Sequence, residues 1–216
     1  MPHRIFRNRR EAGRLLAERL LALQPVDPVV LGLPRGGVPV AAEIATALHA
    51  PLDVLLVRKL GAPHQPELAI GAMIAGDSTE VVLNEDIVAH LGLTPADIAA
   101  ETKRQLALIE KRSRIYRDVR QPQPVEGRTA IVVDDGAATG ATLRAALKGV
   151  ARQRPSRLIA AVPVASDYAV DLLRQEADTV VTLRVPRFFG SVGAFYRDFS
   201  EVSDNEVVAL LGKASR

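Results

Sequence analysis

The sequence predicts an α/β fold in which helices flank a doubly wound, mostly parallel sheet of about five strands. Short runs of β-branched and other apolar residues alternate with helical patterns, and these runs lack the polar alternation of a half-exposed strand. The runs are residues 29–33, 52–57, 129–133, 158–164 and 179–185. No Gly-x-Gly-x-x-Gly follows the first strand and no Gly-Lys-Ser/Thr follows a glycine loop, which disfavours dinucleotide and P-loop nucleotide sites.

Composition is typical of one globular domain. The 216 residues are 48% hydrophobic and 25% charged, and we expect a single domain over 1–216 with its core at about 28–185. Cysteine is absent, which excludes disulfides, thiolate metal sites and a cysteine nucleophile. The N-terminus lacks an apolar signal segment and no run reaches transmembrane length, so we expect a cytoplasmic protein without a membrane partner. The net charge of +3 is too mild to predict a nucleic-acid partner.

Helical patterns fill the intervals between the strands. Pro95 at a first helical position and Asp97 in the first turn predict a helix from Thr94 to about Arg117. The other predicted helices cover residues 8–23, a segment ending near 49, 84–91, a segment from about 142, 166–176, and a short segment capped at 203–206. Residues 69–75 and 80–83 predict a hairpin and 60–67 predict a loop, so an insertion occupies about 60–83.

The residues after strand 129–133 carry the strongest chemical signal. Asp134 and Asp135 stand at the end of the strand, and a loop of small residues and hydroxyls leads into a helix from about Thr142. A helix N-terminus presents unpaired amides and partial positive charge, so the loop predicts an anion site. Two carboxylates beside it suit hydroxyls or a divalent cation on the same ligand. The pattern indicates a sugar phosphate; the alternative is an ordinary strand-turn-helix with a surface acid pair.

A glycine loop also follows strand 29–33. Gly36 and Gly37 let main-chain amides approach a ligand, and Arg35 adds a fork of donors suited to phosphate. Because both loops follow parallel strands, we expect them at the same sheet edge. The two sites and the acids describe a ligand with phosphate at both ends and a diol between them. Taken alone, the loop after strand 29–33 is also compatible with a tight turn carrying a surface arginine.

The string Val132-Val133-Asp134-Asp135, followed by Ala138-Thr139-Gly140-Ala141-Thr142, resembles the phosphoribosyl-pyrophosphate (PRPP) signature of the type I phosphoribosyltransferases. The resemblance implies that the two acids hold the ribose hydroxyls. It implies a 5′-phosphate site at Gly136, Ala137, Ala138, Thr139, Gly140, Ala141 and Thr142. It implies a pyrophosphate site at Arg35, Gly36, Gly37, Arg58 and Lys59, the last two at the end of strand 52–57. The sequence departs from the family at Gly136 and Ala138, where many members have an apolar residue and a hydroxyl.

The resemblance implies an enzyme that transfers the ribose 5-phosphate group of PRPP to a nitrogenous base and releases pyrophosphate. We expect Asp134, Asp135, Arg35 and Lys59 to be catalytic, and Mg²⁺ to lie near the two acids through ribose hydroxyls or water. We also expect a role in nucleotide salvage and a homodimer; the acceptor base is not identified by the sequence. Gly36→Val is expected to block pyrophosphate but to spare a nucleoside monophosphate.

A non-catalytic regulator of the same fold, which binds PRPP or a nucleotide and acts on RNA or DNA, is the alternative. The charged helix 94–117 and the basic N-terminus keep this alternative open. The N-terminal arginines at 4, 7, 9 and 10 are interpreted as a solvated basic face or as part of a lid over phosphates. A sugar-phosphate hydrolase is disfavoured because no nucleophile elbow or metal-ligand cluster is present.

Aromatic residues concentrate in residues 186–200, where the family places a hood over the base. Phe188 or Phe189 is expected to stack on the base, and a hydrophobic cluster at the sheet edge or a dimer contact is an equal alternative. The loop at 60–67 corresponds to a mobile family loop that excludes water. Its His64 is either an acid–base catalyst or a surface residue.

Overall fold

The structure, a computed structural model, describes residues 6–63, 65–75 and 79–213, which form two sheets. The larger sheet is parallel, with five strands in the order β2-β1-β6-β7-β8. Its strands are β1 (Pro28–Gly32), β2 (Leu52–Val54), β6 (Thr129–Val133), β7 (Arg157–Val164) and β8 (Thr179–Arg184). The predicted α/β class with a five-stranded parallel sheet is therefore confirmed.

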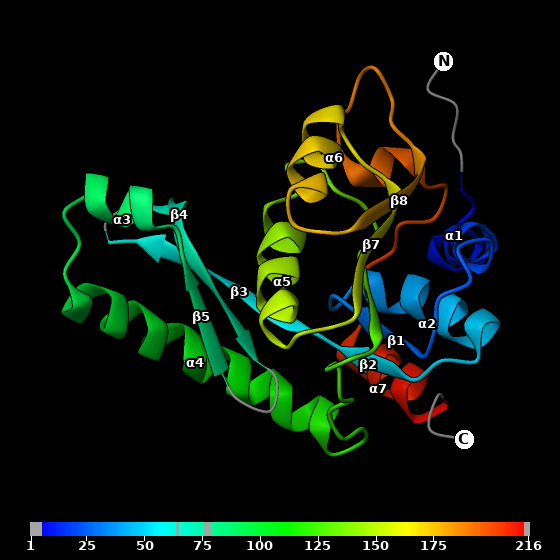
Figure 1. The fold of residues 1–216 in the computed structure, drawn as a ribbon, viewed down its shortest axis with the longest axis horizontal. Coiled ribbons are helices and arrows are strands. Elements are labelled where there is room, and N and C mark those ends of the chain that lie inside the picture. The colour runs from blue at the N-terminus through cyan, green and yellow to red at the C-terminus, as the bar shows by residue number, and fades with distance from the viewer. Residues whose placement is uncertain (1–5, 64, 76–78, 214–216) are drawn as a thin grey trace.

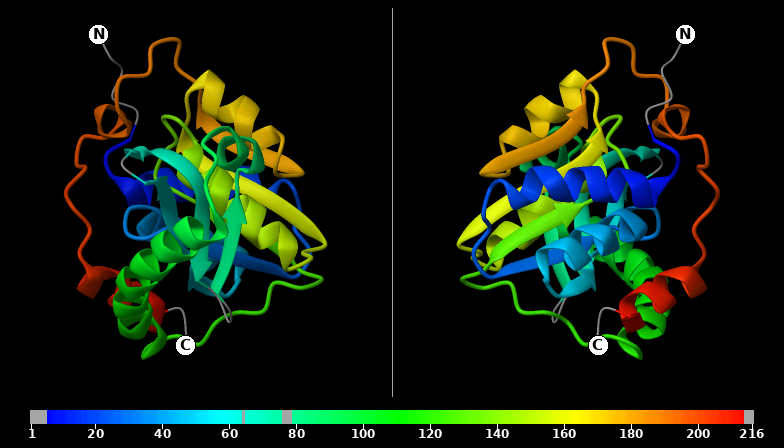
Figure 2. Two further views of the ribbon diagram at one scale, coloured as in Figure 1. Left: turned by 90° about the vertical axis from the view of Figure 1, so that its left-hand side faces the viewer. Right: turned by 90° about the vertical axis from the view of Figure 1, so that its right-hand side faces the viewer.

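Helices cover both faces of this sheet (Figures 1 and 2). The first face carries α1 (Arg9–Leu21) and α2 (Gly37–Leu48), and the other carries α5 (Ala141–Arg152) and α6 (Asp167–Arg174). In β6, Ile131 and Val133 pack on the side of α1 and α2, whereas Ala130 and Val132 pack on the side of α5 and α6. Successive side chains of a strand point to opposite faces, so a strand between two helical layers has no polar face.

A second, antiparallel sheet belongs to an arm that extends away from the core (Figure 1). We define the arm as residues 56–117, of which the structure describes all but 64 and 76–78. It consists of β3 (Leu56–Ala62), β4 (Gln65–Ala75), β5 (Thr79–Leu83), α3 (Glu85–His90) and α4 (Pro95–Arg117). The predicted hairpin forms β4 and β5, and α4 has its predicted bounds, beginning with a capping box between Thr94 and Asp97.

The arm corrects two predictions. The sequence predicts one strand over 52–57, but β2 ends at Val54 and β3 of the other sheet begins at Leu56. The predicted loop at 60–67 is largely strand, since β3 runs to Ala62 and β4 starts at Gln65. His64 lies outside the described residues.

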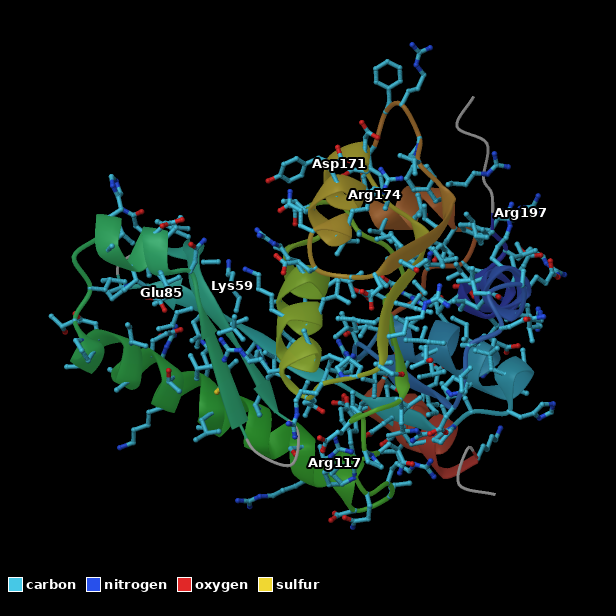
Figure 3. All side chains as sticks on the ribbon, viewed as in Figure 1. Lys59, Glu85, Arg117, Asp171, Arg174 and Arg197 are labelled. Atoms are coloured by element: carbon cyan, nitrogen blue, oxygen red, sulfur yellow. The ribbon has the colours of Figure 1, made fainter. Side chains whose placement is uncertain are left out.

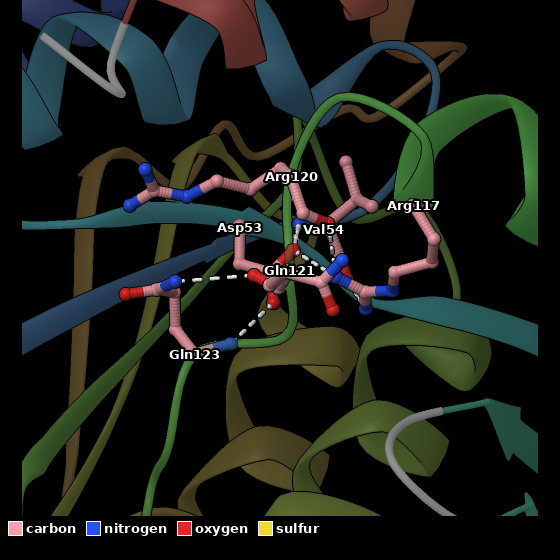
Figure 4. A network of polar contacts seen from close by, with 6 residues as sticks. All are labelled: Asp53, Val54, Arg117, Arg120, Gln121 and Gln123. Atoms are coloured by element: carbon pink, nitrogen blue, oxygen red, sulfur yellow. Dashed lines mark hydrogen bonds and ion pairs between the residues drawn. The ribbon is translucent and has the colours of Figure 1, made fainter.

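A buried ion pair ties the arm to the core sheet. Arg117, at the C-terminal end of α4 (Figure 3), places Nη1 2.6 Å from Oδ1 of Asp53 in β2 (Figure 4). Asp53 is only 3% exposed, and its other oxygen accepts the amide of Gln123 at 3.0 Å. Burial raises the pKa of Asp53, and the positive charge of Arg117 opposes this rise. The attachment of the arm to the core sheet therefore depends on the pairing of the buried Asp53 carboxyl with the Arg117 guanidinium.

We expect Arg117→Met to lower the free energy of unfolding by about 3 kcal/mol, because removing one partner leaves the Asp53 carboxyl buried without its cation. Urea denaturation measures this loss. Arg104→Met is the matched control: the Arg104 side chain is 62% exposed where it pairs with Glu101 of the same helix, and ion pairs open to solvent are worth less than about 1 kcal/mol. Equal losses in the two variants would contradict the role assigned to Arg117.

After β8 the chain passes through a short 3₁₀ helix (Val192–Phe195) and runs to α7 (Asp204–Lys213), which packs beside α4 (Figure 2). Aromatic rings cluster between this segment and the N-terminal segment. They are Phe6, Phe189, Phe195, Tyr196 and Phe199. Within the described residues, no helix has the length and apolarity needed to span a membrane.

Candidate functional site

The acid pair lies at the C-terminal end of β6, the central strand of the sheet. The amide of Asp134 donates to the carbonyl of Ala161 at 3.3 Å, and the amide of Asp135 donates to Oδ1 of Asp134 at 2.8 Å. Burial raises the pKa of Asp134 well above its ordinary value, and the negative charge of Asp135 raises it further. Burial raises the pKa of Asp135 as well. Perturbed carboxyls of this kind are typical of functional sites.

Arg9 holds Asp135, which the sequence did not predict. Its Nε lies 2.7 Å from Oδ2 of Asp135, its guanidinium carbon lies 3.8 Å from the centre of the Phe199 ring, and its side chain is only 11% exposed. This position corrects the interpretation of Arg9 as part of a solvated basic face. Its charge opposes the effect of burial on the pKa of Asp135. The hydroxyl of Tyr196 also donates to the main-chain carbonyl of Asp135, at 2.6 Å.

The first glycine loop, residues 34–37, packs directly against the acid pair. A Cβ on Gly36 would lie 2.0 Å from Oδ2 of Asp135, and a Cβ on Gly37 would lie 2.6 Å from the carbonyl oxygen of Val133. Glycine is required at both positions because any side chain would occupy the space of the acids or their strand. The amide of Gly37 donates to the carbonyl of Leu33 at 2.9 Å. This amide therefore has a main-chain partner, and its contact with pyrophosphate stays a prediction.

Arg35, in the same loop, forms an ion pair with Glu201. The peptide bond between Pro34 and Arg35 is cis. The residue thus lies at the sheet edge that the sequence predicted, close to the acid pair, but its partner comes from the C-terminal segment.

The second loop, residues 136–142, is hydrogen-bonded to its neighbours near its start and exposed near its end. The amide of Ala137 donates to the carbonyl of Val164 at 2.9 Å, and the Ser166 hydroxyl donates to the carbonyl of Ala138 at 2.6 Å. The amide of Ala137 therefore has a main-chain partner, and its contact with phosphate stays a prediction. Thr139 and Thr142 are exposed at the N-terminus of α5. The open end therefore offers hydroxyls beside a helix N-terminus.

Gly140 and Gly136 fix the path of this loop. Gly140 has a φ of +71° and directly precedes α5, a conformation that favours glycine. A Cβ on Gly136 would lie 2.5 Å from Cγ1 of Val192, so the loop also contacts the segment that follows β8.

Arg58 and Lys59 do not share a face, contrary to the prediction that both follow a parallel strand. They are consecutive residues inside β3, so their side chains point to opposite sides of the arm sheet. Lys59 lines a small cavity of about 60 Å³ together with Ala141 and Thr142, and Figure 3 shows it between the arm and α5. Lys59 therefore lies near the second loop, whereas Arg58 points away from it.

The aromatic candidates at 186–200 occupy different environments. The Phe189 ring lies 5.3 Å from that of Phe195 within the aromatic cluster, whereas Phe188 is 93% exposed. A separate pocket of about 330 Å³ lies between the arm, α5 and α6, where Thr139 and the 65% exposed Tyr168 form part of its wall. Phe188 is thus free to contact a ligand, and Phe189 is committed to packing.

The sequence model of the phosphoribosyl transferase domain matches residues 4–199, most of the chain. The chain belongs to this family. Two Mycobacterium tuberculosis proteins, from strains CDC 1551 / Oshkosh and ATCC 25618 / H37Rv, are 47% identical over 213 residues and carry provisional names as phosphoribosyl transferases. The match covers 99% of this chain but 48% of either relative, so the chain spans about half of their length. The crystal structure of TT1426 from Thermus thermophilus is 48% identical, with a TM-score of 0.89, and the match covers 97% of this chain and 98% of that one.

Members of this family generally act on PRPP with Mg²⁺. No group of three or more His, Asp or Glu side chains within the described part of the chain could hold a metal ion. Mg²⁺ commonly binds through one or two carboxylates together with substrate phosphates and water. Asp134 and Asp135 fit that limited role, in which the substrate supplies most of the ligands.

Proposed function

We propose that this phosphoribosyl transferase domain catalyses transfer of the ribose 5-phosphate group of PRPP to a nitrogenous base with release of pyrophosphate. One observation carries the proposal: Gly36 lies so close to the Asp135 carboxylate that a single added carbon would overlap it. This contact joins the first glycine loop to the acid pair, and the second loop follows the acids directly. A ligand with a diol between two phosphate groups fits this arrangement.

The roles follow from position. Asp134 and Asp135 accept hydrogen bonds from the ribose hydroxyls, and the exposed hydroxyls of Thr139 and Thr142, beside the N-terminus of α5, bind the 5′-phosphate. Arg35 and the amide of Gly36 bind pyrophosphate. Lys59 lines a cavity together with Thr142, and this position suits a contact with the 5′-phosphate better than a contact with pyrophosphate.

The reaction depends more on stabilising the charges that develop in the transition state than on proton transfer. The bond from the anomeric carbon to pyrophosphate oxygen breaks, a bond to the acceptor nitrogen forms, and that nitrogen loses its proton to solvent. Positive charge grows on the ribose while negative charge grows on the leaving group. Arg35 would stabilise the leaving anion, and the fixed acids would hold the ribose in line. A bound Mg²⁺ would add positive charge at pyrophosphate.

The exposed Phe188 is the better candidate for stacking on the base, because Phe189 already packs on Phe195. The regulatory alternative has less support than the sequence suggested. Arg9 pairs with Asp135 and Arg117 with Asp53, and both arginine side chains are largely buried. Cations held by internal partners are poorly available to a nucleic-acid backbone.

Calorimetric titration with PRPP and Mg²⁺, followed by a pyrophosphate-release assay against a panel of purine, pyrimidine and amine acceptors, tests the proposal. We expect binding and release with at least one acceptor class. Binding without release from any acceptor would favour a regulatory protein. No binding of PRPP would contradict the proposed site itself.

A further inference from the structure

The C-terminal segment 196–201, which we call the strap, contacts the groups assigned to both halves of PRPP. Tyr196 donates its hydroxyl to the carbonyl of Asp135, on the ribose side. Arg9, the partner of Asp135, donates from Nη1 to the carbonyl of Ser200 at 2.8 Å. The next residue, Glu201, pairs with Arg35 on the pyrophosphate side. The strap therefore contacts, in order along its chain, the groups assigned to the ribose and then the group assigned to pyrophosphate.

Glu201 has a fixed main chain and a free side chain. Ser200 is held by Arg9, and its amide donates to Oδ1 of Asp198 at 3.0 Å, while Val202 is buried in the core. The side chain of Glu201 between these anchors is 77% exposed. Its carboxylate reaches Arg35 from an anchored position, but the exposed side chain can leave by rotation alone.

The Glu201 carboxylate and pyrophosphate are anions that need the same cation. In the structure, Arg35 Nη2 donates to Oε1 of Glu201. A phosphate that binds Arg35 bidentately through an edge that includes this Nη2–H must displace the carboxylate.

We propose that Glu201 is an internal competitor for pyrophosphate, which occupies Arg35 in the free protein and lowers its affinity for the pyrophosphate group of the substrate. This inference rests on the proposed function, because it takes Arg35 as part of the pyrophosphate site. A weak or singly charged anion gains too little from Arg35 to displace Glu201, whereas pyrophosphate with its higher charge does so. Glu201 thus biases the site toward highly charged ligands and favours release of the product anion.

The test is calorimetric titration of the full chain with inorganic pyrophosphate and Mg²⁺, with and without Glu201→Gln. We expect the variant to bind pyrophosphate about two- to fivefold more tightly, the range set by loss of an exposed ion pair. Glu206→Gln is the matched control. Glu206 lines the same cleft of about 150 Å³ as Arg9 and Glu201. Its substitution by glutamine therefore removes one negative charge nearby and leaves the proposed competitor in place.

Tighter binding in Glu201→Gln with unchanged binding in Glu206→Gln supports the inference. An equal gain in both variants would overturn it, because general electrostatics would then explain the effect. Unchanged or weaker binding in Glu201→Gln alone would also overturn it. If neither the wild type nor Glu201→Gln binds pyrophosphate, the assignment of Arg35 falls together with the inference, whereas binding that is equal in both leaves the proposed function intact.

Discussion

Gly36→Ala is expected to weaken PRPP binding about ten- to a hundredfold, the effect of losing one or two hydrogen bonds to charged groups. The new methyl carbon would lie 2.0 Å from Oδ2 and 2.7 Å from Cγ of Asp135, so the carboxylate must turn away. That movement breaks the 2.7 Å bond to Arg9 and removes a ribose ligand. The φ of Gly36 is −64°, which alanine adopts freely, so the effect acts on the acid and not on the backbone.

Calorimetric titration measures the loss, and Gly190→Ala is the control because a Cβ there meets no atom within 4 Å. Binding of ribose 5-phosphate should weaken along with binding of pyrophosphate, since the displaced acid belongs to the ribose side. The structure thus revises the expectation that substitution at Gly36 blocks pyrophosphate alone. Loss of pyrophosphate binding with intact ribose 5-phosphate binding would show that the loop and the acid act independently.

The core of the fold was predictable because its strands are buried on both faces. The run 130–133 has no polar alternation, and this pattern is typical of a strand in a parallel sheet between two helical layers. The start of α4 was equally clear, because the capping hydroxyl of Thr94, Pro95 and Asp97 act locally. Interactions between residues close in sequence leave a signal that can be recognised.

The arm was not predictable in the same way. The run 52–57 is apolar throughout, apart from Asp53, but β2 pairs with β1 and β3 pairs with β4. Hydrophobicity reports burial and not the identity of the pairing partner, so the division at Leu55 leaves no trace in composition. The misplacement of Arg58 and Lys59 follows from this one missed division.

The site was predictable in its loops but not in the residues that restrain them. Asp134, Asp135, Gly36 and Arg35 stand in short motifs next to strand ends. Arg9 lies 126 positions from its partner Asp135, and nothing near it distinguishes it from Arg10. Such pairs depend on tertiary packing, which brings α1 and the strap to the acids.

Asp134→Asn is expected to weaken PRPP binding and to stabilise the fold. The amide keeps the shape of the carboxyl but loses the charge that makes it a strong acceptor for ribose hydroxyls, so we expect a loss of about tenfold or more, as for a hydrogen bond to a charged group. It also removes a half-buried negative charge that lies beside Asp135. We expect the free energy of unfolding near pH 8 to rise by about 1 kcal/mol, the size of ordinary single-substitution effects.

The pH dependence identifies the cause of this gain. Because the pKa of Asp134 is higher in the folded state than in the unfolded chain, the wild type is stabilised by this group at low pH and loses that contribution as the pH rises through the raised pKa. Asparagine does not titrate, so the stability difference between variant and wild type should be small near pH 4 and grow toward neutral pH. Urea denaturation across this range measures it, with Asp171→Asn in an exposed ion pair as the control. A constant difference across the range would mean that Asp134 affects stability through packing. It would then contradict the view that burial and the charge of Asp135 make the ionised Asp134 unfavourable.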